Sequence, residues 1–147
     1  MIRTATLGLA AIAALIAGCS QTMATAKERP APVQPFVGEG NVLFMVYANP
    51  VEGKDAEFNT WYDRHMGAIA KLPEFVKAQR FIVQPRANRP LPPYKYVVVY
   101  EVKGGDIDAA NAAIGAAVKA GQVEAPDMKL ILKLESMAYK AFTPVMH

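Results

Sequence analysis

Two predicted strands, residues 41–48 and 94–102, are apolar at nearly every position. Successive side chains of a strand point to opposite faces of its sheet, so a sheet built on these strands has two faces that need cover. This requirement constrains the fold more than any other feature of the sequence. The strands are also rich in valine, tyrosine and phenylalanine, which favour sheet structure.

The remaining elements follow from periodicity and from turn residues. Phe58, Tyr62, His65 and Ile69 recur at steps of four, three and four, which predicts a helix from Asp55 to about Leu72 that ends before Pro73. Further strands are expected at 75–84 and 134–142, with a proline-rich loop at 85–93 and a second helix from about 106 to 120. The order predicts an α+β, ferredoxin-like βαββαβ fold with a four-stranded antiparallel sheet and both helices on one face.

Two helices can cover only one face of such a sheet. An exposed apolar face of that size is rare on a soluble single subunit, so the sequence predicts a homodimer in which the two uncovered sheet faces pair. The alternative is that the segment before the domain, or the loop at 85–93, folds over this face. Residues 41–147 are the predicted domain.

The first residues have the pattern of a bacterial export signal. Arg3 precedes an apolar run at 7–16, which is about half the ~20 residues that span a bilayer. Ile16-Ala17-Gly18-Cys19 resembles the lipobox of lipoproteins, which implies a signal peptide at 1–18 and acylation (diacylglycerol and palmitate) at Cys19. The alternatives are an ordinary secretory signal with a chance cysteine, or a buried free thiol.

The resulting lipoprotein is predicted to lie in the bacterial cell envelope. Several acyl chains on one residue make membrane attachment stable. Ser20, in place of an acidic residue after the cysteine, favours the outer membrane, with the domain facing the periplasm. Residues 19–40 contain Pro30, Pro32 and Pro35 without an apolar period, so we expect a flexible linker, or else an ordered arm packed on the domain.

Composition excludes several classes of function. Sixteen Lys and Arg against 13 Asp and Glu give a formal charge of +3, and no basic run is present that could follow a nucleic-acid backbone. The only cysteine is Cys19, and no Cys and His cluster has the spacing of a metal site. We therefore expect no nucleic acid and no metal as partners.

Two stretches resemble the signature of EthD-like proteins in the dimeric α+β barrel superfamily. These are residues 57–65, Glu-Phe-Asn-Thr-Trp-Tyr-Asp-Arg-His, and residues 72–81, Leu-Pro-Glu-Phe-Val-Lys-Ala-Gln-Arg-Phe. The resemblance implies a dimer whose sheets close a barrel, with a small-molecule pocket in each subunit between sheet and helices. Members include cofactorless monooxygenases, polyketide cyclases, isomerases and haem-binding proteins, so the fold does not name a reaction.

His65 is the main candidate for chemistry, because the helix period directs it toward the sheet, where the resemblance places the pocket. A neutral imidazole can remove a proton from a phenol or an enolisable ketone. Tyr62 is the second candidate catalytic residue, as a donor to a developing enolate. The structural alternative is a core histidine satisfied by a carbonyl or a tyrosine. Met66-Gly67-Ala68 departs from the family pattern and leaves the imidazole without an orienting carboxylate.

Five further residues are candidate ligand contacts. Arg80 could bind a carboxylate or oxyanion, although such an arginine more often pairs with an acid across the sheet. The others are the aromatic residues Trp61, Tyr47, Tyr96 and Tyr100.

Four possible functions follow from the export signal, the predicted fold and the candidate residues. The leading one is a lipid-anchored periplasmic dimer that binds a small apolar or aromatic molecule, without a cofactor. The first alternative is a cofactorless cyclase, isomerase or monooxygenase with His65 as base. The second is a haem protein with His65 as axial ligand. The third is a structural envelope lipoprotein without a ligand. The sequence leaves open whether any reaction takes place.

Overall fold

The computed structural model describes residues 35–145. The predicted signal peptide, Cys19 and the linker up to residue 34 lie outside the described residues. None of the helices within 35–145 is long and apolar enough to cross a membrane. The elements, in chain order, are β1 (Val42–Pro50), α1 (Asp55–Ile69), β2 (Phe75–Ile82), β3 (Tyr96–Val102), a 3-10 turn (Lys103–Gly105), α2 (Ile107–Lys119) and β4 (Ile131–Tyr139).

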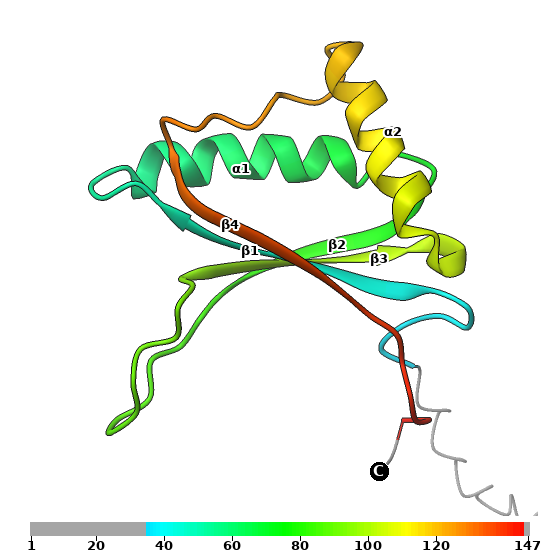
Figure 1. Ribbon diagram of the computed structural model, residues 1–147, viewed down its shortest axis with the longest axis horizontal. Helices are drawn as coiled ribbons and strands as arrows, with labels where there is room; N and C mark the ends of the chain where they lie inside the picture. Colours follow the sequence, from blue (N-terminus) through cyan, green and yellow to red (C-terminus); the bar gives the residue numbers. More distant parts are fainter. Residues whose placement is uncertain (1–34, 146–147) are drawn as a thin grey trace, which may run out of the picture. The chain divides into compact units, whose positions relative to one another are not determined.

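The strands form one antiparallel sheet in the order β2-β3-β1-β4. Both helices lie on the same side of this sheet (Figure 1). The predicted ferredoxin-like fold is therefore confirmed. We call the side that carries the helices the inner face and the opposite side the outer face. The unit of residues 33–147 is compact by itself and contains every described element, so this part of the chain is expected to fold independently.

The last strand differs from its predicted position. It was expected at 134–142 but runs over Ile131–Tyr139. The reason is its partner: β4 pairs only with β1, which begins at Val42 and continues through an irregularity between Asn49 and Pro50 to reach Ile131. The pairing between β1 and β4 ends at Leu43 and Tyr139, and the residues after Tyr139 leave the sheet.

An aspartate lies at the start of each helix, and the two aspartates have different roles. Asp106 caps α2, since its carboxylate accepts a hydrogen bond from the Ala109 backbone N–H at 2.9 Å. Asp55 is the first residue of α1 instead of its cap, and its carboxylate binds the Lys95 ammonium and the Tyr96 hydroxyl. Asp55 thus ties the start of α1 to β3.

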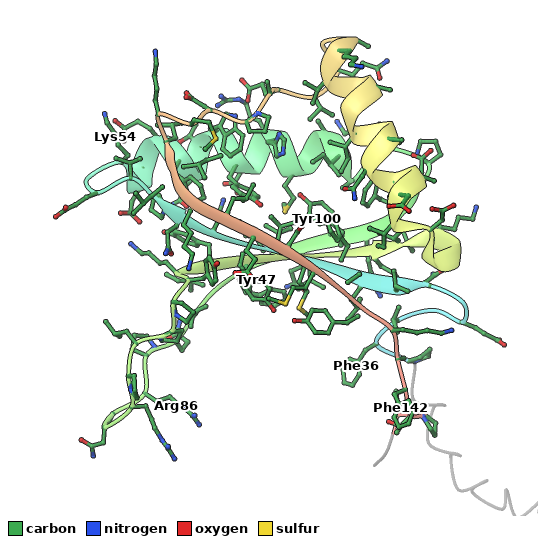
Figure 2. The ribbon with its side chains drawn as sticks, in the orientation of Figure 1. Phe36, Tyr47, Lys54, Arg86, Tyr100 and Phe142 are labelled. Atoms are coloured by element: carbon green, nitrogen blue, oxygen red, sulfur yellow. The ribbon has the colours of Figure 1, made fainter. Side chains whose placement is uncertain are left out.

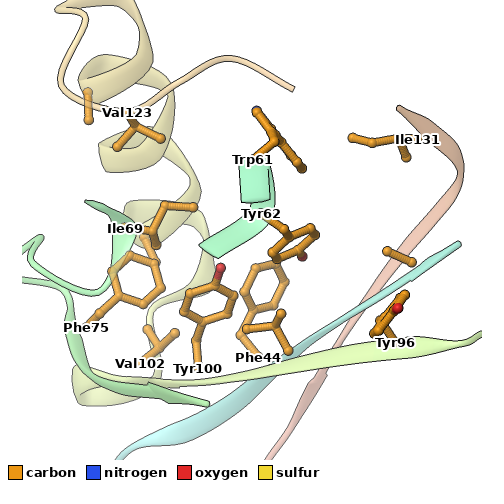
Figure 3. Close-up of a cluster of buried hydrophobic side chains, with 14 of the residues drawn as sticks. Phe44, Trp61, Tyr62, Ile69, Phe75, Tyr96, Tyr100, Val102, Val123 and Ile131 are labelled. Carbon is orange, nitrogen blue, oxygen red and sulfur yellow. The ribbon is translucent and has the colours of Figure 1, made fainter. Parts of the chain in front are cut away.

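The core lies between the inner face and the helices (Figure 3). Phe58 of α1 is fully buried, and its ring lies 5.2 Å from the ring of Tyr62 and 5.5 Å from that of Tyr96. From β3, Val98, Tyr100 and Val102 are buried on the same side. Every second residue of a strand points to the same face, so these large side chains fill the inner face of the sheet, as predicted from the sequence.

The outer face is apolar and has no helix over it. Its apolar members are Leu43, Met45, Tyr47, Phe81, Val97, Val99, Met137 and Tyr139, none of which is fully buried. The loop between β2 and β3, which could have covered them, is exposed along residues 84–93 and extends beyond the end of the sheet (Figure 1). Within residues 35–145, this face therefore remains open to a partner.

The end of the predicted linker is attached to the outer face. Val37 is buried, and the Gly38 backbone N–H and the Asn41 side-chain amide each donate to the Glu101 carboxylate at 2.7 Å. Lys77 pairs with the same carboxylate at 2.9 Å. Burial opposes ionisation of Glu101, but these donors outweigh it and hold its pKa below the usual value. Residues 37–41 are thus an ordered arm.

Candidate functional site: a cavity between the sheet and the helices

A cavity of about 220 Å³ lies between the inner face and the two helices. Its lining residues are Phe44, Val46, Trp61, Tyr62, His65, Ile69, Tyr100, Asn111, Ile114, Val118, Pro126, Ile131, Leu134 and Ser136. Four of the seven residues singled out from the sequence for catalysis or ligand binding, namely His65, Tyr62, Trp61 and Tyr100, therefore meet around one space. The wall is mostly apolar, and the lining contains no Lys, Arg, Asp or Glu.

The orientation of His65 is defined by two contacts. Its ring stacks on the indole of Trp61, with centroids 4.7 Å apart and an interplanar angle of 23°. Its Nδ1 lies 2.8 Å from the backbone carbonyl oxygen of Glu124. A carbonyl oxygen can only accept, so Nδ1 carries the proton and Nε2 of the neutral ring keeps its lone pair. Within residues 35–145, Nε2 makes no hydrogen bond, which leaves it free to act as a base or acceptor.

Burial lowers the pKa of His65, and the nearby Glu124 carbonyl and carboxylate oppose this only in part. The imidazole is therefore neutral at pH 7, as a general base must be. The pKa values of the two phenols beside the imidazole shift in the opposite direction. Burial raises the pKa of Tyr62 to about 12, with Arg80 partly offsetting it, and burial also raises the pKa of Tyr100. Both phenols stay protonated and can donate.

This pKa shift makes a prediction about stability. A His65 whose folded pKa lies below its unfolded value stabilises the fold above about pH 6.5, and the contribution is lost as the pH falls through the folded pKa. We expect the free energy of unfolding to decrease between pH 7 and pH 5 more steeply in the wild type than in His65→Gln. Urea unfolding at several pH values measures this, and parallel pH profiles for the two proteins would contradict it.

Tyr62 and Tyr100 add two hydroxyl groups to the cavity. Both residues are at least nine-tenths buried, with 3% and 2% of their surfaces exposed. Within the described part of the chain neither hydroxyl makes a hydrogen bond, and neither oxygen is among the fully buried polar atoms that lack a partner, so both hydroxyls keep some accessible surface. Figure 3 shows both side chains between α1 and the sheet, where both line the cavity. Two free phenols next to a free imidazole nitrogen suit a ligand that carries its own oxygen atoms.

Arg80 and Tyr96 lie beside the cavity but do not line it. The Arg80 guanidinium binds Asp63 at 2.9 Å and the Asn59 side chain, and it stacks over the rings of Tyr62 and Tyr96 at 5.5 and 5.0 Å. The Tyr96 hydroxyl bonds Asn59 and Asp55. The structure thus pairs Arg80 with an acid of the neighbouring helix and uses both residues to fasten α1 to the sheet.

Tyr47 lies on the outer face, away from the other candidates (Figure 2). Its hydroxyl is 3.4 Å from that of Tyr139, and this hydrogen bond together with burial raises the pKa of Tyr47 to about 12. The parity of the strands explains the separation. Phe44 and Tyr100 are partners on the inner face, so the odd-numbered Tyr47 points to the opposite side.

The residue that orients His65 was not predicted from the sequence. Glu124 lies in the segment between α2 and β4, where its carbonyl binds His65 and its carboxylate pairs with Arg64 at 3.1 Å. A backbone carbonyl in an irregular segment leaves no signal in the sequence. Asn111 and Ser136, the remaining polar residues of the lining, were also missed. Their helix and strand were predicted, but the sequence did not show that these two side chains face the cavity.

Haem does not fit this cavity as the chain shapes it. Ligand pockets for drug-sized molecules begin at about 300 Å³, which exceeds the 220 Å³ found here, and a porphyrin is larger than most such molecules. The lining also lacks any Lys or Arg to pair with propionate groups. The described residues contain no group of three or more His, Cys, Asp or Glu that could hold a metal ion.

No protein-family model matches the sequence, and no curated protein matches it either. Solved structures show similarity. A mutant of SnoaB, a cofactor-independent oxygenase from Streptomyces nogalater, is 19% identical, with 71% of this chain and 95% of that chain covered and a TM-score of 0.45. A dabb family protein with a ferredoxin-like fold from Mesorhizobium loti is 11% identical, with 70% and 98% covered and a TM-score of 0.48.

A third similar structure is a mutant of MhuD with two manganese protoporphyrin IX molecules bound per active site. It is 15% identical, with 72% of this chain and 99% of that chain covered and a TM-score of 0.49. Similarities at this level extend no activity, ligand or assembly to the present chain. The EthD-like resemblance stays a prediction, and the chain is assigned here by its topology, as a ferredoxin-like α+β domain.

Proposed function

We propose that the protein binds a small, uncharged aromatic or apolar molecule in the cavity beside His65. The observation that carries this proposal is a set of three polar atoms that make no hydrogen bond within residues 35–145, Nε2 of His65 and the hydroxyls of Tyr62 and Tyr100. They face a space whose wall is otherwise apolar apart from Asn111 and Ser136. A dry cavity of about 150 Å³ already holds benzene. The 220 Å³ here suits one substituted ring. Without a charged lining residue, an ionic ligand would lose its hydration without compensation.

Proton abstraction by His65 is the second candidate function. It is favoured by the Glu124 carbonyl, which fixes the tautomer with Nε2 unprotonated. A ketone whose α-hydrogen faces Nε2 would become an enolate, and a phenol of Tyr62 or Tyr100 would donate to its oxygen. This chemistry needs no cofactor, in keeping with the cyclase or isomerase alternative.

The proposed setting is a homodimer held at the outer membrane through Cys19. The open outer face supports the dimer, and its charges fit a second copy better than a charged partner. Lys77 pairs with Glu101 at 2.9 Å, and on β4 Lys133 lies over the ring of Tyr94 while Glu135 accepts from the Tyr94 hydroxyl, so the face carries charges of both signs. Pairing two identical faces then brings no net like charge together.

Binding is tested with acetophenone and phenol, because Trp61 is the only tryptophan of the chain and lines the cavity. We expect both compounds to change its fluorescence in a saturable manner. The Tyr62→Phe, Tyr100→Phe double variant removes two donors and should weaken binding at least about tenfold, in the range of one to two hydrogen bonds. Absence of saturable binding for both compounds at millimolar concentration would overturn the proposal.

Proton abstraction is tested separately, by deuterium incorporation into the methyl group of acetophenone in heavy water. The wild type should accelerate the exchange, and His65→Gln should reduce the acceleration by about 100-fold or more. His147→Gln, which changes the only other histidine, is the matched control and should exchange as the wild type does. If His65→Gln binds acetophenone and still exchanges at the wild-type rate, His65 is not the base.

A further inference from the structure

Three large apolar side chains stand at the two ends of the outer face and contact little of their own chain. Phe36 is 81% exposed, Leu91 is 76% exposed and Phe142 is 99% exposed. In Figure 1 the loop that carries Leu91 leaves one end of the sheet, and the segment that carries Phe142 leaves the other. Both extend on the side away from the helices, and Figure 2 shows Phe36 and Phe142 on that side.

Phe36 is held in this position by the arm described above. Val37, next to it, is buried, and the Gly38 backbone N–H is fixed to the Glu101 carboxylate at 2.7 Å. The ring of Phe36 therefore stands up from the face close to a rigid attachment. The buried Glu101 carboxylate, with its three donors, anchors the arm, which would otherwise be a simple spacer.

The face beside Phe36 is hollowed on both sides of its ring. One hollow, of about 680 Å³, is lined by Phe36, Leu43, Lys77, Ala78, Gln79, Phe81, Val99 and Glu101. The other, of about 510 Å³, lies between residues 35–37, Leu43 and residues 139–145. Each is large enough for an aromatic side chain and offers mainly apolar wall, so the same face carries both projecting rings and hollows to receive rings.

We propose that residues 35–37, the segment 140–144 and the loop around Leu91 are clamps that grip the second copy of this chain. This inference rests on the proposed self-association. When two outer faces pair, whatever projects from the ends of one face reaches the partner. Because the pairing is symmetric, each copy then supplies Phe36, Leu91 and Phe142 to its partner and receives the same three residues. Aromatic anchors in hollows are the side chains that contribute most to such contacts.

The experiment measures the dissociation constant of residues 33–147, the part that is compact by itself, by analytical ultracentrifugation. Phe36→Ser, Leu91→Ser and Phe142→Ser should each raise the constant about tenfold or more, in the range for truncated interface anchors. Met128→Ser is the matched control, since Met128 is 68% exposed but lies between α2 and β4, on the helix side. Its dissociation constant should stay within about twofold of the wild-type value, because surface changes remote from a contact have small effects.

The outcomes separate this inference from the self-association itself. All three side chains are exposed in the single chain, so thermal melting of the isolated subunit should change little. Suppose the wild type is a dimer and a lysine at the centre of the outer face dissociates it, but the three serine variants keep the wild-type constant. The dimer then stands and the clamps are refuted. A wild type that is a single subunit overturns both.

Discussion

Val99→Lys is expected to convert the proposed dimer into single subunits, with a dissociation constant raised about 100-fold or more. Val99 lies on the central strand β3, opposite Met45 and Gln79, and lines the larger hollow of the outer face. Pairing of two outer faces would bury the introduced ammonium beside Glu101, whose carboxylate already binds Lys77, the Gly38 backbone N–H and the Asn41 amide. In a symmetric dimer the cost is incurred twice.

Ala116→Lys serves as the control for charge. Ala116 is exposed on α2, at the opposite side of the domain, and this variant adds the same charge without touching the outer face. We expect it to remain a dimer. Sedimentation velocity measures both variants, and circular dichroism confirms that they are folded. A Val99→Lys protein that sediments as the wild-type dimer would show that the outer face is not the contact.

Phe58→Ala is expected to cause the largest loss of stability, about 3–5 kcal/mol in the free energy of unfolding. Phe58 is 0% exposed, and its ring lies 6.1 Å from that of Trp61 and 5.2 Å from that of Tyr62. Removing it leaves a void behind two residues that line the cavity, so ligand affinity should fall together with stability.

Urea denaturation measures this effect, with Phe58→Leu as the comparison. Leucine keeps much of the volume and the apolar character, so its cost should be distinctly smaller than that of alanine. If Phe58→Ala lost less than about 1 kcal/mol, the packing of α1 on the sheet through this ring would be wrong.

The order of elements could be predicted from the sequence because each has a strong local signal. A nearly continuous run of valine and tyrosine marks β3, and the 4-3-4 spacing of Phe58, Tyr62, His65 and Ile69 marks α1. The limits of β4 could not be predicted in this way, since they are set by the length of β1 and by the irregularity at Asn49 and Pro50. Such pairing is a property of two distant segments.

The candidate site, too, could be predicted from the sequence only in part. His65, Tyr62 and Trp61 share a helix face, so the period alone brings them to the cavity. Tyr47 and Tyr100 were both chosen from apolar strands, but only the register between β1 and β3 shows that they lie on opposite faces. The contact between His65 and the Glu124 carbonyl depends on the path of an irregular segment, which no residue pattern encodes.

Self-association and the cavity are connected through the sheet. Phe44 and Tyr100 line the cavity from the inner side, while Met45 and Val99, adjacent to them in β1 and β3, lie on the outer side. A partner that covers the outer face would stabilise the strands on which the cavity is built. We therefore expect variants of the outer face to lower the thermal stability of the site as well as the affinity between subunits.

Sedimentation equilibrium of residues 33–147, from low to high micromolar concentration, tests whether two copies of the chain pair through the outer face. We expect the mass of two chains, with dissociation only at the lowest concentrations. A stable, soluble single subunit over the whole range would contradict it, because the apolar outer face would then be tolerated in water without a partner.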